Sequence, residues 1–150
     1  WDDPDLRLVL LGGAGAVDDE VTAMIERLEL GPRVVRPGRV PDAHRDGLIA
    51  LADALVFPSE YEGFGAPVVE AMALGTPVIG SDQAALAEVI GDAGIVLPRE
   101  PEAWADALDV LTHRGIELSS AGRRRAELFT AERSGAGLAA AYRTALGADR

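Results

Sequence analysis

The chain has 150 residues, a length that suits one domain with a single sizeable core, and 48% of them are hydrophobic. Its net charge of −11 excludes a nucleic-acid-binding protein, because such proteins neutralise phosphates with a surplus of basic side chains. The sequence contains no cysteine, which excludes disulfides, thiolate metal sites and cysteine nucleophiles and fits the cytoplasmic location that we expect. No apolar run approaches the roughly 18 residues of a membrane-spanning helix.

Five short apolar segments, each rich in Val, Ile or Leu and bounded by Gly or Pro, predict strands buried on both faces of a parallel sheet. They are residues 6–11, 33–36, 54–57, 77–80 and 94–97. Helical patterns follow at residues 21–28, 48–52, 67–74, 84–90, 102–111, 117–129 and 134–146. The alternation predicts an α/β, Rossmann-like domain of three α/β/α layers with a parallel sheet of about five strands.

Few other features suggest chemistry. His44 and His113 lie far apart in the sequence without further ligands at metal spacing, so we expect no metal site. The basic triplet at residues 123–125 lies in a helical pattern, and we interpret it as a solvated face. All 14 basic residues are arginine, so a lysine Schiff base and a P-loop lysine are excluded.

In a fold of this type, ligands bind in the segments that follow the carboxyl ends of the strands. The first segment, GGAGA at residues 12–16, has Asp18 where a dinucleotide fingerprint needs its third glycine. We therefore interpret it as a strand-to-helix turn that needs a positive φ, with NAD binding as the alternative. The segments at residues 37–41, 81–84 and 98–101 are short or plain, whereas the one at 58–65 is chemically informative.

The segment PSEYEGFG at residues 58–65 leads from a buried strand into a helix that Pro67 opens. Gly63 and Gly65 flank Phe64, so the main chain can approach a ligand closely with its N–H groups exposed. A helix N-terminus beside such amides forms an anion site that suits a diphosphate. The sequence therefore predicts a phosphate-binding turn at this position.

Glu62 and Glu70 stand on either side of this turn with seven residues between them. Helical side chains lean toward the N-terminus, so we expect both carboxylates to face one cleft, where they can accept hydrogen bonds from vicinal hydroxyls. The alternative for Glu70 is a role at the helix dipole or a buried arginine partner. Because its neighbours are apolar and an unpaired buried carboxylate is costly, we favour a functional role. The adjacent Glu60 is expected to be solvated.

The stretch PSEYEGFGAPVVEAMALGTPVIGSD resembles the signature of the retaining glycosyltransferases of the GT-B fold, family 4, also called group 1 glycosyltransferases. Their mark is a Glu, seven residues and a second Glu around a G-F-G core, which here is Glu62-GFGAPVV-Glu70. The G-x-V-P loop at residues 38–41 and the segment AEVIGDAG at residues 87–94 agree with the family as well. The resemblance covers nearly the whole chain and is most specific between residues 36 and 100.

The resemblance implies a role for each of these positions. Glu62, the predicted catalytic residue, would contact hydroxyls of the transferred sugar, and Glu70 would hold the ribose of the nucleotide. Val40 would lie against the base through main-chain contacts. Further contacts to the sugar and the diphosphate are expected from the turn, at Gly63, Phe64, Gly65 and Ala66. The family retains the anomeric configuration and needs no metal, so we expect no cofactor beyond the nucleotide-diphosphate sugar.

Residues 1–150 would then form the C-terminal, nucleotide-sugar-binding domain of a two-domain enzyme, truncated at its N-terminus. We expect the acceptor, and any membrane contact, to be bound by a first domain that is absent here. Also absent are the Arg and Lys that the family normally provides just before Leu6 to stabilise the leaving diphosphate. We therefore expect weak donor binding and no transfer by this chain alone. The last helix is expected to expose Leu138, Ala139 and Tyr142.

Two other hypotheses remain open from the sequence. One is a catalytically silent nucleotide or nucleotide-sugar binding module that kept the fold. The other is a generic flavodoxin-like or NAD-binding domain, for which residues 62–70 would have no ligand. The nucleotide base, the sugar and the acceptor are not encoded in any side-chain pattern that we can interpret.

Overall fold

The computed structural model describes residues 4–147, which form two compact units. The first unit ends at Gly47 and the second begins at Leu48, so the boundary lies inside helix α2 (Asp42–Leu51). The two units are described separately below.

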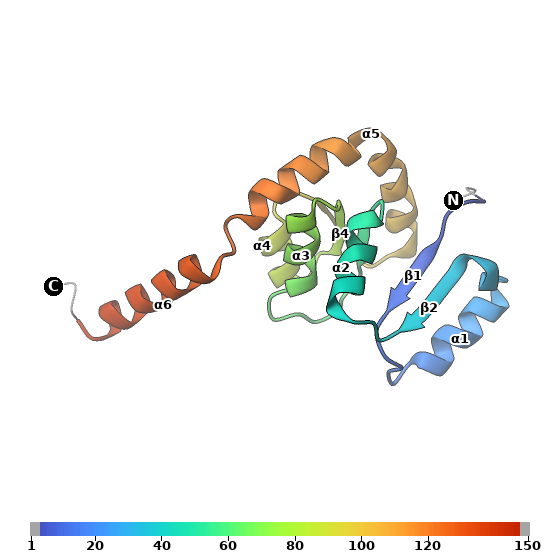
Figure 1. Cartoon of the computed structure of the whole chain (residues 1–150), viewed down its shortest axis with the longest axis horizontal. Coiled ribbons are helices and arrows are strands. Elements are labelled where there is room, and N and C mark those ends of the chain that lie inside the picture. Colours follow the sequence, from blue (N-terminus) through green and yellow to red (C-terminus); the bar gives the residue numbers. More distant parts are fainter. Residues whose placement is uncertain (1–3, 148–150) are drawn as a thin grey trace. The chain divides into compact units, whose positions relative to one another are not determined.

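The first unit consists of a two-stranded parallel sheet and one α-helix (Figure 1). Strand β1 (Leu8–Leu11) pairs with β2 (Val34–Gly38), with Leu8 opposite Val34. Helix α1 (Asp18–Arg27) follows β1, and the short 3₁₀ helix η1 (Gly31–Arg33) leads into β2. The GGAGA segment turns the chain from β1 into α1 with Gly12 at a φ of 136°, which matches the strand-to-helix turn that the sequence predicts.

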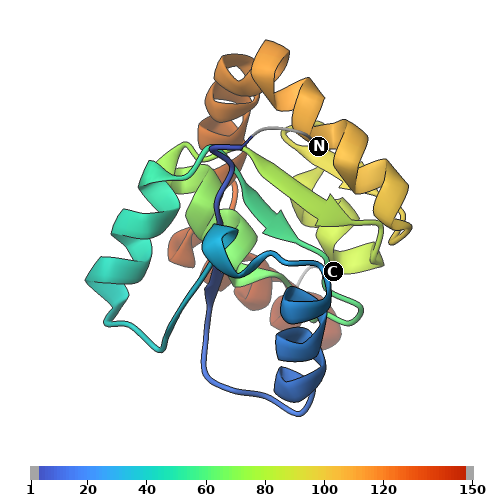
Figure 2. The ribbon, with the colours of Figure 1, turned by 90° about the vertical axis from the view of Figure 1, so that its right-hand side faces the viewer.

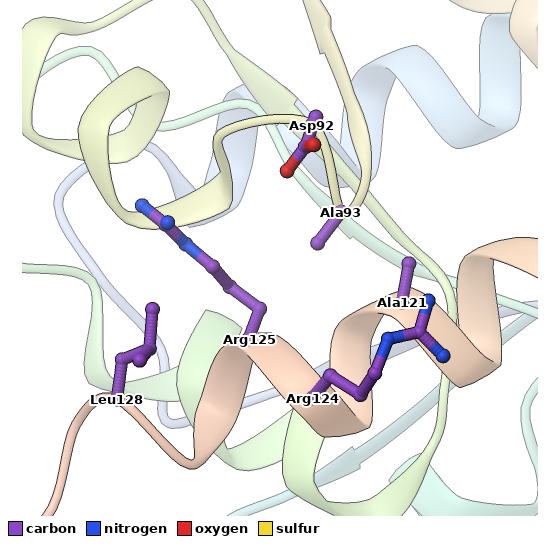
Figure 3. Close-up of a pocket in the computed structure, with 6 residues that line it drawn as sticks. All are labelled: Asp92, Ala93, Ala121, Arg124, Arg125 and Leu128. Carbon is purple, nitrogen blue, oxygen red and sulfur yellow. The ribbon is translucent and has the colours of Figure 1, made fainter.

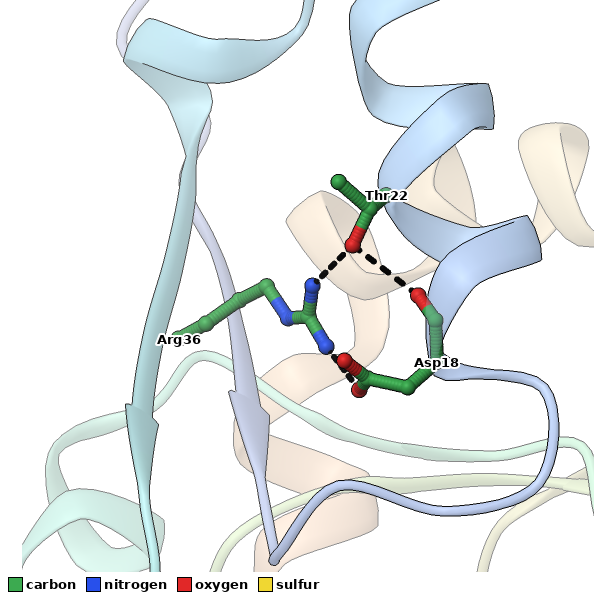
Figure 4. Close-up of polar contacts among 3 residues, drawn as sticks. All are labelled: Asp18, Thr22 and Arg36. Carbon is green, nitrogen blue, oxygen red and sulfur yellow. Dashed lines mark hydrogen bonds and ion pairs between the residues drawn. The ribbon is translucent and has the colours of Figure 1, made fainter.

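Arg36 fastens the beginning of α1 to β2 in this unit (Figure 4). Its guanidinium pairs with the carboxylate of Asp18 and donates a hydrogen bond of 2.8 Å to the hydroxyl of Thr22, one turn further along the helix. That hydroxyl in turn donates to the main-chain oxygen of Asp18 at 2.9 Å. The acid at the first helical position also complements the positive end of the helix dipole.

The second unit is built on a three-stranded parallel sheet with β4 (Val78–Ser81) between β3 (Leu55–Phe57) and β5 (Ile95–Leu97) (Figure 2). Leu55 lies opposite Val78, and Ile79 lies opposite Ile95. Every residue of β4 is buried, as expected for a central strand that is covered on both faces. The carboxyl ends of the three strands therefore lie along one edge.

Four helices follow the strands of this unit (Figure 1). Helix α3 (Ala66–Leu74) packs against β3 and β4, α4 (Ala84–Ile90) against β4 and β5, and α5 (Pro101–Ala126) against α3. The largest side chains with less than 2% exposure are Met72, Ile79, Leu86, Ile90, Leu118, Val68, Val78 and Ser81. Burying each large apolar side chain contributes roughly 1.5–3 kcal/mol, so this cluster determines how α3 sits on the sheet.

Helix α6 (Ala131–Ala145) carries no buried residue. Its N-cap is Thr130, whose hydroxyl accepts a hydrogen bond of 3.2 Å from the N–H of Arg133. Leu138 is 60% and Tyr142 63% exposed, and Ala139 is exposed as well. The exposure that the sequence predicts for these three side chains is therefore found in the structure.

The five predicted strands are all present within about two residues of their predicted bounds, and all pair in parallel. They form two sheets of two and three strands, whereas we expected one sheet of about five. Residue 37 of β2 is a proline, which donates no hydrogen bond to a neighbouring strand, and β3 has only three residues. A short strand, or one that lacks an N–H donor, offers few main-chain hydrogen bonds through which a sheet could be extended.

The prediction of two helices at residues 102–111 and 117–129 was wrong, because α5 runs unbroken for 26 residues. Gly115 in its middle weakens a helix by roughly 1 kcal/mol relative to alanine. Packing on both sides outweighs that cost, since Ala107 and Leu118 are buried. Arg114 also donates to Glu117 at 2.8 Å across the same turn, and this hydrogen bond lowers the pKa of the Glu117 carboxyl.

The interpretation of residues 123–125 as a solvated face was correct only in part: Arg123 and Arg124 are exposed, but Arg123 and Arg125 also bind the ends of other helices. Arg123 donates to the carbonyl oxygen of Leu74 at 2.7 Å, at the C-terminus of α3. Arg125 donates to the carbonyl oxygens of Glu88 and Val89 at 2.6 and 3.1 Å, near the C-terminus of α4. Both guanidiniums satisfy helix-end carbonyls and complement the negative end of a helix dipole.

The turn into α3 gives a direct test of this fold. Gly65 has a φ of 89°, and a Cβ at this position would lie 2.5 Å from Cδ2 of Leu86. We predict that Gly65→Ala lowers the free energy of unfolding by about 2–4 kcal/mol, because it combines backbone strain with overpacking. Urea denaturation measures this difference.

Gly63→Ala is the matched control, since a Cβ at Gly63 would meet no atom within 4 Å. Its free energy of unfolding should stay within about 0.5 kcal/mol of the unsubstituted chain. Equal stabilities for the two variants would contradict the left-handed conformation and the tight packing of Gly65.

Candidate functional site

The loop between β3 and α3 and the helix α3 itself carry six of the seven predicted site residues, four in the loop and two on the helix. Gly65 adopts the left-handed conformation directly before α3 and serves as its N-cap, with a proline inside the first turn. The N–H groups of Val68 and Val69 both donate to the carbonyl oxygen of Gly65, at 3.0 and 3.4 Å. The N-terminus of α3 is therefore capped by a main-chain carbonyl, without a side-chain cap.

This geometry leaves a run of main-chain donors at the start of α3. Within residues 4–147, the N–H groups of Gly63, Phe64, Gly65 and Ala66 have no protein acceptor. Ala66 is the first residue of the helix, and the first N–H groups of a helix point outward at its N-terminus, where the dipole favours negative charge; the other three donors precede the helix. The arrangement can bind an anion such as a diphosphate.

Glu62 comes directly before these donors and is half-buried. Its Oε1 atom accepts a hydrogen bond of 3.0 Å from the hydroxyl of Ser59. That hydroxyl also lies 3.3 Å from the carbonyl oxygen of Tyr61, but the single proton favours the nearer, charged acceptor. One side of the Glu62 carboxylate is thereby fixed, and a carboxylate keeps further lone pairs for a ligand hydroxyl.

The segment that follows β4 holds this loop in place. The hydroxyl of Ser81 donates to the carbonyl oxygen of Ser59 at 2.5 Å, and Nε2 of Gln83 donates to the carbonyl oxygen of Glu62 at 3.1 Å. We had interpreted residues 81–84 as plain, and that interpretation was wrong. A Ser and a Gln at the carboxyl end of the neighbouring strand are the signal that could have identified them.

The segment that follows β5 also contacts the loop. Arg99 lies 3.1 Å from the Glu60 carboxylate, with side-chain exposures of 49% and 79%. Glu60 is as exposed as predicted, and an ion pair so open to solvent contributes little to stability. The loop after β3 is thus bonded to the segments after both other strands of the sheet.

Glu70 lies on α3, four residues after Ala66, and is half-buried rather than enclosed. Residues four apart share one face of a helix, so Glu70 stands above the exposed Ala66 at the helix start. Val68, Ala71 and Met72 are fully buried and form the opposite, core-facing side. The Glu70 carboxylate is not without a partner in the structure.

The side chain of Phe64 is 46% exposed and also contacts the rest of the fold. Its ring packs edge-on against Phe129, with the centroids 5.6 Å apart and an interplanar angle of 72°. The guanidinium of Arg125 lies 5.6 Å from the centre of the Phe129 ring. The glycine-flanked turn is therefore anchored at its middle residue to the end of α5.

Val40, the seventh predicted site residue, belongs to the first unit, where it lies two residues after β2 and is half-buried. A cavity of about 570 Å³ lies beside the GGAGA turn and is lined by residues that include Gly12, Asp18 and Arg36. It marks the carboxyl ends of β1 and β2, where this fold binds ligands. The contact between Val40 and a base stays a prediction.

A second hollow, of about 250 Å³, is a poor candidate for the site (Figure 3). Asp92 and Ala93 line it and come just before β5, so it lies near the amino end of that strand. Figure 3 shows the side chains of Arg124 and Arg125 pointing apart, with no convergence on one point. Arg125 is also occupied by the end of α4.

Residues 4–147 contain neither a metal-binding cluster nor a membrane-spanning helix. No group of three or more His, Asp or Glu side chains is arranged to hold a metal ion there. In the same residues, no helix has the length and apolar surface needed to cross a membrane.

Comparison with known proteins identifies the family. Residues 1–127 match the sequence model of the family described as "Glycosyl transferases group 1". The chain belongs to this family. The membership agrees with the resemblance carried by Glu62, Glu70 and the turn between them.

A relative from Mycobacterium tuberculosis, the GDP-mannose-dependent alpha-(1-6)-phosphatidylinositol dimannoside mannosyltransferase, is 35% identical over 139 residues. The match covers 91% of this chain and 35% of that protein. The solved sucrose-phosphate synthase of Thermosynechococcus elongatus superposes with a TM-score of 0.82 and 29% identity, covering 95% of this chain and 39% of its own. The solved structure of HepE from Anabaena in complex with UDP-glucose superposes with a TM-score of 0.74 and 27% sequence identity. This match covers 83% of this chain and 36% of HepE.

These matches confirm the predicted Rossmann-like α/β fold of the group 1 glycosyltransferases. The family also excludes the generic flavodoxin-like or NAD-binding domain that the sequence left open. The chain spans about a third of the length of the mycobacterial relative.

The hydrogen bonds around the loop predict a measurable stability difference. Ser81 is fully buried, and Ser81→Ala leaves the carbonyl oxygen of Ser59 without its donor. We predict a loss of about 1–3 kcal/mol in the free energy of unfolding, the usual effect of an unsatisfied polar group. Urea denaturation measures it.

Arg99→Ala is the comparison variant, because it removes an ion pair to the same loop that is largely exposed. This substitution should change the free energy of unfolding by no more than about 0.5 kcal/mol. If Arg99→Ala destabilised the chain as much as Ser81→Ala, the loop would be held by the exposed ion pair and not by the β4 segment.

Proposed function

We propose that this chain binds the nucleotide-diphosphate sugar that serves as donor to a retaining glycosyltransferase. The observation that carries the proposal is the run of four main-chain N–H groups at the start of α3 that lack a protein acceptor among residues 4–147. Glu62 and Glu70 flank this run, one before it and one a helical turn after it. Amides for phosphates next to carboxylates for hydroxyls are the groups that such a donor requires.

Each predicted residue then has a role in the proposal. The amides of Gly63 to Ala66 accommodate the diphosphate and the adjacent sugar. Glu62 accepts hydrogen bonds from hydroxyls of the transferred sugar through the part of its carboxylate that Ser59 leaves open. Glu70 accepts hydrogen bonds from the ribose, and main-chain groups around Val40 contact the base.

Relatives support a donor of this class. The mycobacterial relative is GDP-mannose-dependent by name, and HepE was solved in complex with UDP-glucose. The two names differ in base and in sugar, so they support the diphosphate-sugar part that both donors share. We leave the base and the sugar of this chain's donor open within that class.

The proposed reaction transfers a hexose from the donor to an acceptor hydroxyl with retention of anomeric configuration. The bond between the anomeric carbon and the diphosphate breaks, and negative charge grows on the departing diphosphate. Donors aimed at developing charge stabilise such a transition state, and the amides at the start of α3 supply part of that stabilisation. We expect the chemistry to need neither a metal nor a resident cofactor.

The chain alone is expected to bind the donor weakly and to transfer nothing. No lysine occurs anywhere in the sequence, so the cation that the family normally places on the diphosphate is absent. The acceptor would be bound by a further domain of a longer protein, located in the cytoplasm and in contact with membranes, if at all, through that domain. The second candidate is a catalytically silent nucleotide-sugar binding module.

Donor binding is tested by titrating the ¹⁵N-labelled chain with GDP-mannose and with UDP-glucose. We predict that one of them shifts the amide resonances of Gly63 to Ala66. We predict also that Glu70→Gln raises the dissociation constant about tenfold, because it weakens charged hydrogen bonds to the ribose.

Glu60→Gln is the matched control, since it removes one carboxylate from the same loop while leaving the predicted contacts in place. The dissociation constant of this variant should stay within about twofold of the value for the unsubstituted chain, since salt screens the remaining long-range effect of the lost charge. The proposal fails if both donors leave the amides of residues 63–66 unshifted, or if the two variants weaken binding equally.

Joining residues 1–150 to the rest of a full-length glycosyltransferase separates an enzyme from a silent module. We predict sugar transfer with retained anomeric configuration and an unchanged rate in the presence of EDTA. Nuclear magnetic resonance of the product identifies the anomer. Binding without any transfer would favour the silent module, and loss of transfer in EDTA would contradict metal independence.

A further inference from the structure

Both ends of the Gln83 side chain are engaged. Its Oε1 atom accepts hydrogen bonds from the N–H groups of Ala85 and Leu86, at 2.8 and 3.2 Å, and so caps α4. Its Nε2 atom donates to the carbonyl oxygen of Glu62 at 3.1 Å. If the amide were flipped, its NH₂ group would face the N–H groups of Ala85 and Leu86, and its oxygen would face the carbonyl oxygen of Glu62. The hydrogen-bond partners therefore determine the orientation of the amide.

The Glu62 carbonyl that Gln83 holds belongs to the same peptide unit as the N–H of Gly63. A trans peptide is planar, so its N–H points opposite to its C=O. By fixing the carbonyl, Gln83 also fixes the direction of the Gly63 N–H, the first of the four donors without a protein acceptor in the described residues.

The Glu62 side chain is fixed from the same direction. Ser81 donates to the carbonyl oxygen of Ser59, and Ser59 donates to the Glu62 carboxylate. The peptide and the carboxylate of Glu62 are therefore both oriented by the segment after β4. Gln83 is the member of this group that reaches Glu62 directly from another strand end.

We propose that Gln83 is a positioning residue, which orients Glu62 and the Gly63 N–H for the sugar-bearing end of the donor. The proposal rests on the proposed function and adds a determinant to it. Its consequence is selectivity: Gln83 strengthens binding of a nucleotide-diphosphate sugar more than binding of the nucleoside diphosphate alone. A residue that only capped α4 would influence both ligands alike.

Gln83→Glu separates the two roles of the side chain. A glutamate keeps the acceptor that caps α4 and is favourable at a helix N-terminus, but when ionised it has no proton to donate to the Glu62 carbonyl. Gln83→Ala removes both roles without adding charge. We expect Gln83→Glu to lower the melting temperature less than Gln83→Ala, because only Gln83→Glu keeps the cap of α4.

The first measurement needs no ligand. In the donor-free chain, Gln83→Glu should shift the Gly63 amide resonance and lower the backbone order parameters of residues 63–66, with the amides of α4 unchanged. Unchanged resonances and order parameters at residues 63–66 would overturn the proposal, whether or not the chain binds a donor.

The second measurement compares GDP-mannose with GDP, and UDP-glucose with UDP, by calorimetry or by resonance shifts. For the pair that binds, we expect both Gln83 variants to weaken the sugar-bearing ligand about tenfold and the nucleoside diphosphate about twofold or less. Repulsion from the new charge of Gln83→Glu acts on the diphosphate of both ligands, so it does not produce this difference.

The outcomes separate the two claims. If the unsubstituted chain binds neither pair, the proposed function fails, and the ligand-free measurement still decides the role of Gln83. If the unsubstituted chain binds and both variants weaken the two ligands equally, the positioning role is wrong while the proposed function stands.

Discussion

The candidate site depends on how the chain turns from β3 into α3. Gly65 makes this turn in the left-handed conformation, packed against Leu86, and its carbonyl closes the helix. Helices α4 and α6 begin with side-chain caps from Gln83 and Thr130, whereas α3 has none. The N–H of Val68, which a capping side chain would bind, donates to the carbonyl of Gly65 instead, and the N–H groups of Gly63 to Ala66 have no acceptor within residues 4–147 and are available to a ligand.

A turn that exposes its donors needs support from elsewhere, because glycines contribute no side-chain contacts. The structure supplies this support chiefly from the segment after β4 and from Phe129, three residues after the end of α5. The fully buried strand β4 is the rigid element behind them. A ligand that binds here therefore meets donors that are already oriented, which lowers the ordering cost of binding.

Much of this could be predicted from the sequence, because local signals determine it. The Gly-Phe-Gly run, Pro67 and the apolar strands predicted the turn, the helix and the parallel pairing. The supporting contacts could not be predicted, since they join residues more than 20 positions apart, as Ser81 joins Ser59. The continuity of α5 across Gly115 and the contact of Arg123 with the end of α3 could not be predicted either, because both depend on tertiary packing.

The most direct test of the central claim is an experimental structure of the chain, alone or within a longer protein, with its nucleotide-diphosphate sugar bound. The account predicts phosphate oxygens within about 2.7–3.2 Å of the amide nitrogens at the start of α3, with Glu70 on the ribose and Glu62 on the transferred sugar. A donor bound elsewhere, with these amides facing only water, would contradict it.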